Sequence, residues 1–152
     1  MNRFDSVLLV SPLADGRTWI IERDFGYVTR AGGGVDRIEV PLEFLTDFAS
    51  VPRLFWFVFP QWGKYGNAAV VHDYLYWSQL RPRVEADRIF HEAMSVLEVP
   101  GWQRFILYWS VRLFGWSAWR SNQRKKQRGY TKRVAIRSPI LSTMTAKDVQ
   151  GL

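Results

Sequence analysis

Residues 67–97 read NAAVVHDYLYWSQLRPRVEADRIFHEAMSVL and contain two helical patterns joined by a short connection. The first part predicts a helix over Ala68–Gln79 with Asn67 as the N-cap, and the last part predicts a helix over Val84–Leu97. One face of the second helix is apolar, formed at helical spacing by Ala86, Ile89, Phe90, Ala93, Met94 and Leu97. Because only the short segment Leu80–Arg83 joins the two helices, they must run antiparallel.

The residues before this helix pair have the composition of β-strands. β-Branched and aromatic residues are frequent in Ser6–Val10, Thr18–Tyr27 and Val35–Leu45, and turn signals separate these ranges. The turns are Ala14-Asp15-Gly16 and Ala31-Gly32-Gly33-Gly34, where glycine accepts a positive φ without strain. We therefore predict a small antiparallel sheet in the N-terminal part of the chain.

A third helix is expected to begin near Trp102, and its apolar residues fall into two stripes. The first stripe holds Trp102, Phe105, Ile106, Trp109, Leu113 and Trp116, and the second holds Leu107, Val111, Phe114 and Ala118. A helix with two apolar faces is buried or has a partner. The sequence thus predicts a single α+β domain over residues 1–119, with the small sheet packed on a three-helix C-terminal part.

Basic charge is concentrated near the C-terminus. Residues 1–119 carry 12 Lys/Arg and 13 Asp/Glu, whereas residues 120–137 carry eight basic residues and no acidic one. We therefore expect residues 120–152 to form a basic, extended tail, which attaches the domain to a negatively charged partner. The sequence has no cysteine, which excludes disulfides, cysteine nucleophiles and Cys-ligated zinc. No signal peptide and no membrane-spanning helix are expected, because apolar runs of the required length are absent.

His72 and His91 are the only histidines, and both lie in the predicted helices near acidic residues. Across two antiparallel helices, His72 and Asp87 are out of register by about one turn, roughly 5 Å, which side chains can span. A carboxylate that orients an imidazole is a general-base arrangement. The candidate catalytic residues are therefore His72, Asp87 and Ser50, and the candidate metal ligands are Asp47, His72 and Asp73.

The same residues have a non-catalytic interpretation, which the sequence leaves open. Asp47 and Ser50 can shape the loop after a strand through side-chain-to-backbone hydrogen bonds. His72 and its acidic neighbours can simply hold two helices and a loop together. His91 is expected to be structural, because it lies four residues after Asp87 and can pair with it on one helix face.

The third helix and the tail contain the candidate partner-binding residues, which are bulky aromatic or basic. They are Trp109, Trp116, Trp119, Arg120, Arg124, Lys125, Lys126 and Arg128. Tryptophan is a favoured interface anchor, and a basic tail suits an acidic partner, nucleic acid or a membrane surface. A membrane-surface helix over residues 101–128 is a further alternative, against which the second apolar stripe counts.

Three segments carry a family resemblance: Thr46–Arg53, Tyr65–Tyr76, and Ala86–Phe90 with Ala93 and Met94. They resemble domain-of-unknown-function family 1353, short proteins of tailed phages and prophages. The likeness covers residues 4–115 and implies shared polar positions at Asp47, Ser50, His72, Asp73 and Asp87. It implies a location in the host cytoplasm or the virion, and other phage structural proteins as partners.

A looser resemblance concerns Ala68–Tyr76, which is similar to the active-site helix of secreted phospholipases A2. In that family the histidine is the base, the next aspartate binds calcium, and an aspartate on an antiparallel helix orients the histidine. The resemblance implies these roles for His72, Asp73 and Asp87. The glycine-rich calcium loop and the disulfides of that family are not recognisable.

Two functions of different class follow from these patterns. The first is a phage-associated hydrolase, assisted by a divalent metal such as calcium or zinc and acting on cell-wall or membrane components. The second is a non-catalytic virion or tail-assembly protein that docks through the Trp-rich helix and the basic tail. Nucleic-acid binding by the tail is a weaker alternative.

Overall fold

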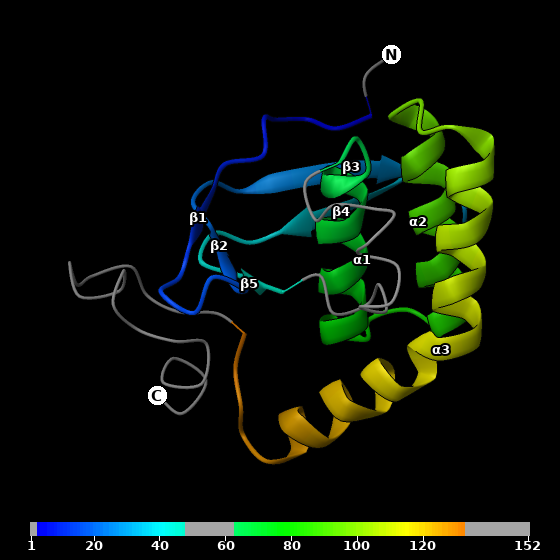
Figure 1. Ribbon diagram of the computed structural model, residues 1–152. Helices are drawn as coiled ribbons and strands as arrows, with labels where there is room; N and C mark the ends of the chain where they lie inside the picture. Colours follow the sequence, from blue (N-terminus) through cyan, green and yellow to red (C-terminus); the bar gives the residue numbers. More distant parts are fainter. Residues whose placement is uncertain (1–2, 48–62, 133–152) are drawn as a thin grey trace.

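The computed structural model describes residues 3–47 and 63–132 and has the expected α+β architecture (Figure 1). Its strands are β1 (Val10–Pro12), β2 (Trp19–Ile21), β3 (Phe25–Thr29), β4 (Asp36–Val40) and β5 (Leu45–Thr46), and its helices are α1 (Gly66–Ser78), α2 (Arg83–Val96) and α3 (Gly101–Gln127). Ser50 lies outside the described residues, and so do residues 133–152 of the expected tail.

The strands form two small antiparallel sheets rather than the single sheet that the sequence predicted. β1, β2 and β5 make one sheet in the order β1-β2-β5, and β3 pairs with β4 in the other. The predicted strand Thr18–Tyr27 is divided between β2 and β3, and the predicted strand Val35–Leu45 is divided between β4 and β5. The second division follows Pro41, which has no N–H for a ladder, and Glu43, whose φ of 70° turns the chain.

Both predicted turns are present. Asp15 Oδ1 accepts hydrogen bonds from the N–H groups of Arg17 and Thr18, at 2.9 and 2.8 Å, ahead of β2. Gly33, with a φ of 83°, lies in the turn between β3 and β4. β2 and β4 follow these turns and pair antiparallel with β1 and β3 respectively.

α1 and α2 are close to the predicted helices, but Asn67 lies inside α1 and is not its cap. The cap position is Tyr65, and the N–H of Gly66 donates to the carbonyl of Gly63 at 3.0 Å. A backbone turn thus satisfies a donor at the start of this helix, so a capping side chain is not needed. Pro82 and Pro100 occupy the cap positions of α2 and α3.

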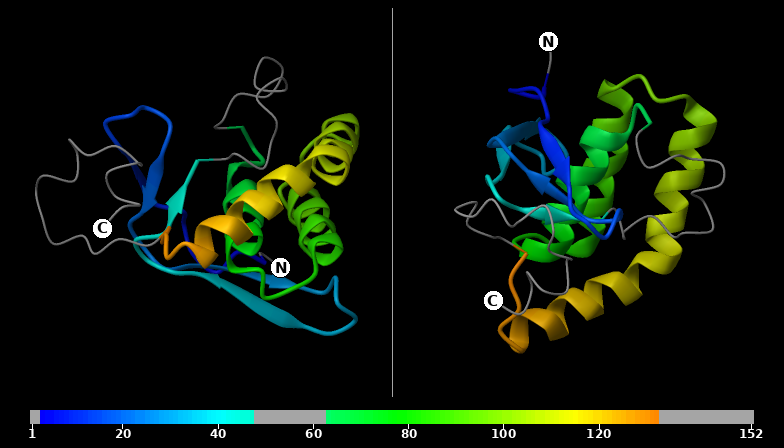
Figure 2. Two further views of the ribbon diagram at one scale, coloured as in Figure 1. Left: turned by 90° about the horizontal axis from the view of Figure 1, so that it is seen from below. Right: turned by 60° about the vertical axis from the view of Figure 1, so that its left-hand side comes forward.

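The strands lie on one side of α1 and α2, and the first half of α3 covers the other side (Figures 1 and 2). β3 and β4 contact α2 and α1 respectively, which buries Phe25, Tyr27 and Val40 in a common core with both helices. α3 changes direction about half way along and curves back beneath α1 (Figure 1). Among the described residues, no helix combines the length and apolar character that crossing a bilayer requires.

The third helix is longer than expected, which corrects the start of the tail. α3 continues to Gln127, so residues 120–127 are helical instead of extended. Arg, Lys and Gln are good helix formers, and the cations of Arg124, Lys125 and Lys126 lie favourably in the last turn, where the helix dipole is negative. After the helix, the carbonyl of Lys132 accepts a hydrogen bond from the N–H of Leu45 at 2.6 Å and so joins this segment to β5.

Candidate functional site

His72 on α1 and Asp87 on α2 are in direct contact across the antiparallel helix pair. His72 Nε2 lies 2.9 Å from Asp87 Oδ1, and both side chains are 0% exposed. The contact expected from the helix spacing is therefore present. A carboxylate in this position accepts the Nε2 proton, which leaves the lone pair of the neutral imidazole on Nδ1.

Asp87 has three further donors, which the sequence did not single out. Tyr76 Oη donates to Oδ1 at 2.6 Å, and Arg112 Nη1 and Arg83 Nη1 donate to Oδ2 at 2.7 and 3.5 Å. Burial alone would raise the pKa of Asp87, but the hydrogen bonds from His72, Tyr76 and Arg112 outweigh it and hold this pKa below its ordinary value. Asp87 is therefore a fully supported carboxylate that fixes the imidazole in one orientation.

The ring of His72 is enclosed. It stacks on Phe90 with ring centres 4.7 Å apart, and the ring of Tyr76 lies 4.2 Å away. Nδ1 is buried and has no hydrogen-bond partner among the described residues. Residues 3–47 and 63–132 thus leave no opening to solvent at His72, and Nδ1 is the one polar atom of the pair left unsatisfied there.

Asp73 takes part in a second buried cluster. Thr46 Oγ1 donates to Asp73 Oδ2 at 2.8 Å, and the backbone N–H of Asp47 donates to the same oxygen at 3.4 Å. Lys132 Nζ lies 4.0 Å from this oxygen and 3.8 Å from Asp47 Oδ1. The loop acid and the helix acid therefore meet, as expected, but they meet around an ammonium group.

The charges of this second cluster depend on one another. Burial raises the pKa of Asp73, and Asp47 adds to this effect while Lys132 opposes it. Burial alone would lower the pKa of Lys132, but the carboxylates of Asp73 and Asp47 raise it above its ordinary value. Lys132 is therefore a buried cation, and its ammonium lies 5.8 Å from the centre of the Trp77 ring.

The predicted metal ligands are thus divided between two clusters. Asp47 and Asp73 surround Lys132, while His72 binds Asp87. Within the described ranges, no three His, Asp or Glu side chains are grouped as a metal ion would require. The sequence could not reveal Lys132 as a member, because 59 positions separate it from Asp73 and no local pattern connects them.

His91 does not pair with Asp87, contrary to the expectation from their spacing. Its ring lies edge-on to Tyr108 of α3, with ring centres 5.3 Å apart. Burial and the nearby Arg104 lower the pKa of His91, which favours the neutral ring. Asp87 accepts from four other donors, and the exposed His91 contacts Tyr108 of α3 instead.

The candidate partner-binding residues of α3 have different surroundings. Trp109 and Trp116 are exposed, whereas Trp119 is partly buried and lies edge-on to Tyr76 with ring centres 5.2 Å apart. Lys126 Nζ donates to the carbonyl of Ser78 at 2.8 Å. Arg120, Arg124 and Arg128 are exposed, and Lys125 is half-buried.

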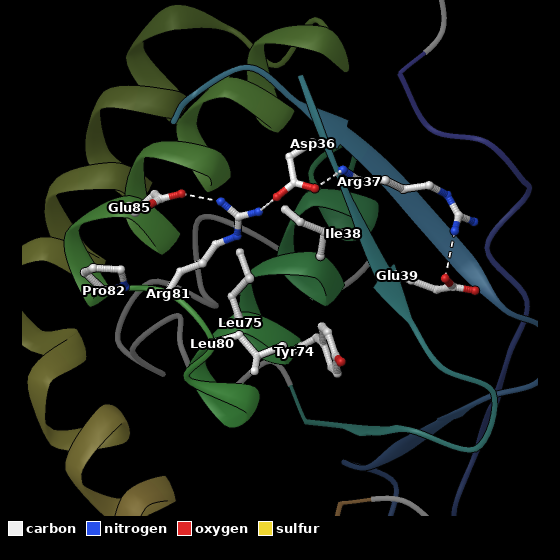
Figure 3. A pocket seen from close by; sticks show the side chains of 10 residues that line it. All are labelled: Asp36, Arg37, Ile38, Glu39, Tyr74, Leu75, Leu80, Arg81, Pro82 and Glu85. Atoms are coloured by element: carbon white, nitrogen blue, oxygen red, sulfur yellow. Dashed lines mark hydrogen bonds and ion pairs between the residues drawn. The ribbon is translucent and has the colours of Figure 1, made fainter. Parts of the chain in front are cut away.

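A surface pocket of about 570 Å³ lies between β4 and the connection from α1 to α2 (Figure 3). The guanidinium of Arg81 lies there between the carboxylates of Asp36 and Glu85 and is paired with both. Neither His72 nor Asp87 belongs to the lining, which consists of Asp36, Arg37, Ile38, Glu39, Tyr74, Leu75, Leu80, Arg81, Pro82 and Glu85. The pocket therefore offers no route to the buried pair.

Gly115 allows α3 to approach Tyr76, and replacing it by alanine is expected to disturb the His72–Asp87 pair. A Cβ at this position would collide with the Tyr76 hydroxyl, which holds Asp87. We expect Gly115→Ala to lower the free energy of unfolding by about 1–3 kcal/mol, measured by urea denaturation.

The matched control is Gly101→Ala at the start of the same helix, where a Cβ would meet only Arg104 at 3.8 Å. This control should not lose stability, because alanine is the better helix former. Equal stability of the two variants would mean that the close approach of α3 to Tyr76 is not maintained in solution.

Comparison with known proteins places the chain in a family. Residues 19–111 match the family described as "Protein of unknown function (DUF1353)". Among curated proteins, the chain is 36% identical to uncharacterized protein y4jT of Sinorhizobium fredii (strain NBRC 101917 / NGR234) over 78 residues, which is 50% of this chain and 23% of that protein. It is 35% identical to uncharacterized protein y4iH of the same organism over 111 residues, 70% of this chain and 44% of that protein.

The matches cover only part of each curated relative. The chain spans less than half the length of both curated relatives, and no solved structure matches it. The matched range includes β2 to β5, α1, α2 and the part of α3 up to Val111, and thus both His72 and Asp87. The chain belongs to the protein family of unknown function DUF1353.

Proposed function

We propose that this protein is a hydrolase in which His72 is the general base and Asp87 is the residue that positions it. The observation that supports the proposal is the hydrogen bonding of the two imidazole nitrogens. Its Nε2 is bound to a carboxylate, and its Nδ1 is buried without a partner among the described residues. A general base needs this combination of a fixed tautomer and an available lone pair.

The proposed step is proton abstraction from a water molecule that attacks an ester or amide carbonyl. His72 Nδ1 takes the proton, and Asp87 stabilises the imidazolium that forms, while Tyr76, Arg83 and Arg112 keep Asp87 ionised and oriented. Because the His72 side chain is fully covered, the reaction requires a movement that exposes Nδ1. Membrane and cell-wall components are the proposed substrates.

A divalent metal remains part of this proposal. Asp47 and Asp73 would be its oxygen ligands, and calcium or zinc would polarise the substrate carbonyl. Such an ion would compete with the ammonium of Lys132, which lies within 4.0 Å of both carboxylates. Metal assistance therefore predicts that Lys132 moves away when the ion binds.

The test is hydrolysis of phospholipid vesicles and of peptidoglycan by the purified protein, with added calcium, with added zinc and with a chelator. His72→Asn is expected to lower the rate by about 10²–10⁴-fold, the usual contribution of a general base. His91→Asn is the matched control, because this second histidine contacts Tyr108 and not Asp87, and it should keep the rate. A His72→Asn variant that is as active as the wild type, or a wild type inactive under all three metal conditions, would contradict the proposal.

A non-catalytic docking role is the second candidate, and the exposed aromatic residues of α3 favour it. In this case the His72–Asp87 pair only stabilises the helix pair, in keeping with its complete burial. A virion or tail-assembly protein, in the host cytoplasm or the virion, is one form of this candidate. Docking that survives the His72→Asn substitution, in a protein without measurable hydrolysis, would favour it over the enzyme.

A further inference from the structure

We propose that the outer face of α3 binds an anionic lipid surface. This face carries an outer row of four residues, Phe105, Trp109, Leu113 and Trp116, which are spaced by three or four positions and therefore lie on one side of the helix. Each is between 46% and 64% exposed. Contiguous apolar surface of this kind on a folded domain marks a place of interaction.

The opposite side of α3 satisfies the packing needs of the domain. Leu107 and Val111 are fully buried in the core, and Gly115 lies against Tyr76. The two sides of α3 thus have separate roles, because Leu107 and Val111 pack in the core while the outer row faces solvent. This arrangement weakens the objection to a lipid-facing helix, because Leu107 and Val111 of the second stripe are covered by the protein itself and only Phe114 of its large side chains is exposed, at 55%.

The positive charge of α3 indicates that the surface bound by the outer row is anionic. α3 has six basic residues and no acidic residue, and the row continues at four-residue spacing from Trp116 to Arg120 and Arg124. The guanidinium of Arg120 lies 5.3 Å from the centre of the Trp116 ring. Aromatic rings at headgroup depth beside cations that face anionic lipids are the features of an interfacial helix.

Other occupants fit these observations less well. A second copy of the chain would bring two acid-free helices of like charge together, which repels them. Duplex nucleic acid would engage the arginines, but contacts to phosphate and sugar would not bury four large apolar side chains. An anionic bilayer accommodates both the apolar row and the cations that continue it.

The experiment is flotation of the full chain with vesicles of phosphatidylcholine alone and with vesicles that also contain phosphatidylglycerol. The wild type should bind the anionic vesicles, and added salt should weaken binding. The double variant Trp109→Ser/Trp116→Ser should lower the partition coefficient by about tenfold or more, because two large apolar side chains no longer enter the interface. Arg120→Ala/Arg124→Ala should weaken binding to anionic vesicles and should leave the low binding to neutral vesicles unchanged.

Matched controls separate this proposal from general stickiness and from the proposed hydrolysis. Val35→Ser/Leu80→Ser removes two strongly exposed apolar residues outside α3 and should bind like the wild type. His72→Asn should also bind like the wild type, so the lipid surface does not depend on the proposed catalysis. Phe105→Ser/Leu113→Ser repeats the test on the other members of the outer row, should the tryptophan pair prove poorly folded by circular dichroism.

Three results would overturn the proposal. The first is a wild type that does not float with anionic vesicles. The second is binding that neither double variant in the outer row reduces. The third is a dimer, detected by light scattering, that Trp109→Ser/Trp116→Ser converts to a monomer without lipid binding by the wild type, because the row would then bind a second copy.

Discussion

Replacing Asp87 by alanine is expected to lower the free energy of unfolding by about 3–5 kcal/mol at pH 7, because removing one partner of a buried ion pair leaves the others uncompensated. Four groups lose their acceptor at once, from His72, Tyr76, Arg83 and Arg112. His72 and Tyr76 are fully buried, so water cannot replace the carboxylate for them. Since domains of this size are stable by about 5–15 kcal/mol, urea denaturation should show a large fraction of the stability lost.

Asp87→Asn is the matched control for shape, because the amide has the size of the carboxylate and keeps one acceptor oxygen, while it loses the charge and replaces the other oxygen by an NH2 donor. We expect it to cost about 1–3 kcal/mol at pH 7, less than alanine. The pH dependence has a definite sign. The pKa of Asp87 is held below 3.8 in the folded protein, so its stabilisation is present above pH 3.8 and is lost as the pH falls through the folded-state pKa.

The asparagine variant should therefore lose less stability than the wild type when the pH is lowered below about 4. The measurement is a series of urea denaturation curves from neutral to acidic pH for both proteins. Two results would show that the hydrogen bonds to Asp87 contribute little in solution. One is a free energy of unfolding that changes with pH in the same way for both proteins. The other is an Asp87→Ala variant within about 1 kcal/mol of the wild type.

The sequence predicted those parts of the fold that depend on local pattern. The helix pair and the turn of Ala31–Gly34 were predicted because the spacing of apolar residues and the glycines act within a few positions. The distribution of the strands over two sheets was not predicted, because it depends on which strand the chain pairs with after Pro41 and Glu43. The end of α3 does not follow from the charge pattern, because a run of basic residues is typical of a tail while Arg and Lys also favour helices.

In the site, too, the sequence predicted the contacts that follow from local spacing and not those that depend on how distant segments pack. The His72–Asp87 contact followed from the antiparallel geometry of two helices with a short connection. Tyr76 could have been included, because it lies four residues after His72 on the same face of α1. Arg112 and Lys132 could not, because their contacts depend on how α3 packs and on where the chain returns to β5.

Each of the two buried clusters joins a side chain of α1 to a cation from a later part of the chain. His72 and Asp73 are neighbours on α1 whose side chains diverge by about 100°, so each faces a different part of the molecule. Each cluster has a cation from the C-terminal part of the described chain, Arg112 of α3 for Asp87 and Lys132 for Asp73. Docking of α3 therefore completes the charge balance of the α1–α2 pair and of the loop after β5.

Replacing Lys132 by methionine is expected to lower the free energy of unfolding at pH 7 by about 3–5 kcal/mol, because it leaves the buried Asp73 beside Asp47 without a cation. Methionine keeps a long apolar side chain against Trp77, so the loss reports the charge more than the volume. Arg128→Met is the matched control, because this basic residue is exposed, and it should change stability by no more than about 0.5 kcal/mol.

The pH dependence of the Lys132→Met variant distinguishes lost charge from lost packing. The pKa of Asp73 is already above 3.8 in the folded protein, and removing the ammonium raises it further. A carboxyl with a raised folded-state pKa is uncharged in both states at low pH, and its penalty develops as the pH rises from the unfolded-state pKa of 3.8 to the folded-state pKa. The deficit of the variant should thus be small near the ordinary aspartate pKa of 3.8 and should grow as the pH is raised to neutrality. Adding Asp73→Asn should recover about 1–3 kcal/mol at pH 7, since the two positions are coupled. A deficit that is independent of pH and unaffected by Asp73→Asn would mean that Lys132 stabilises the protein through its side-chain packing and its backbone bond to β5 alone.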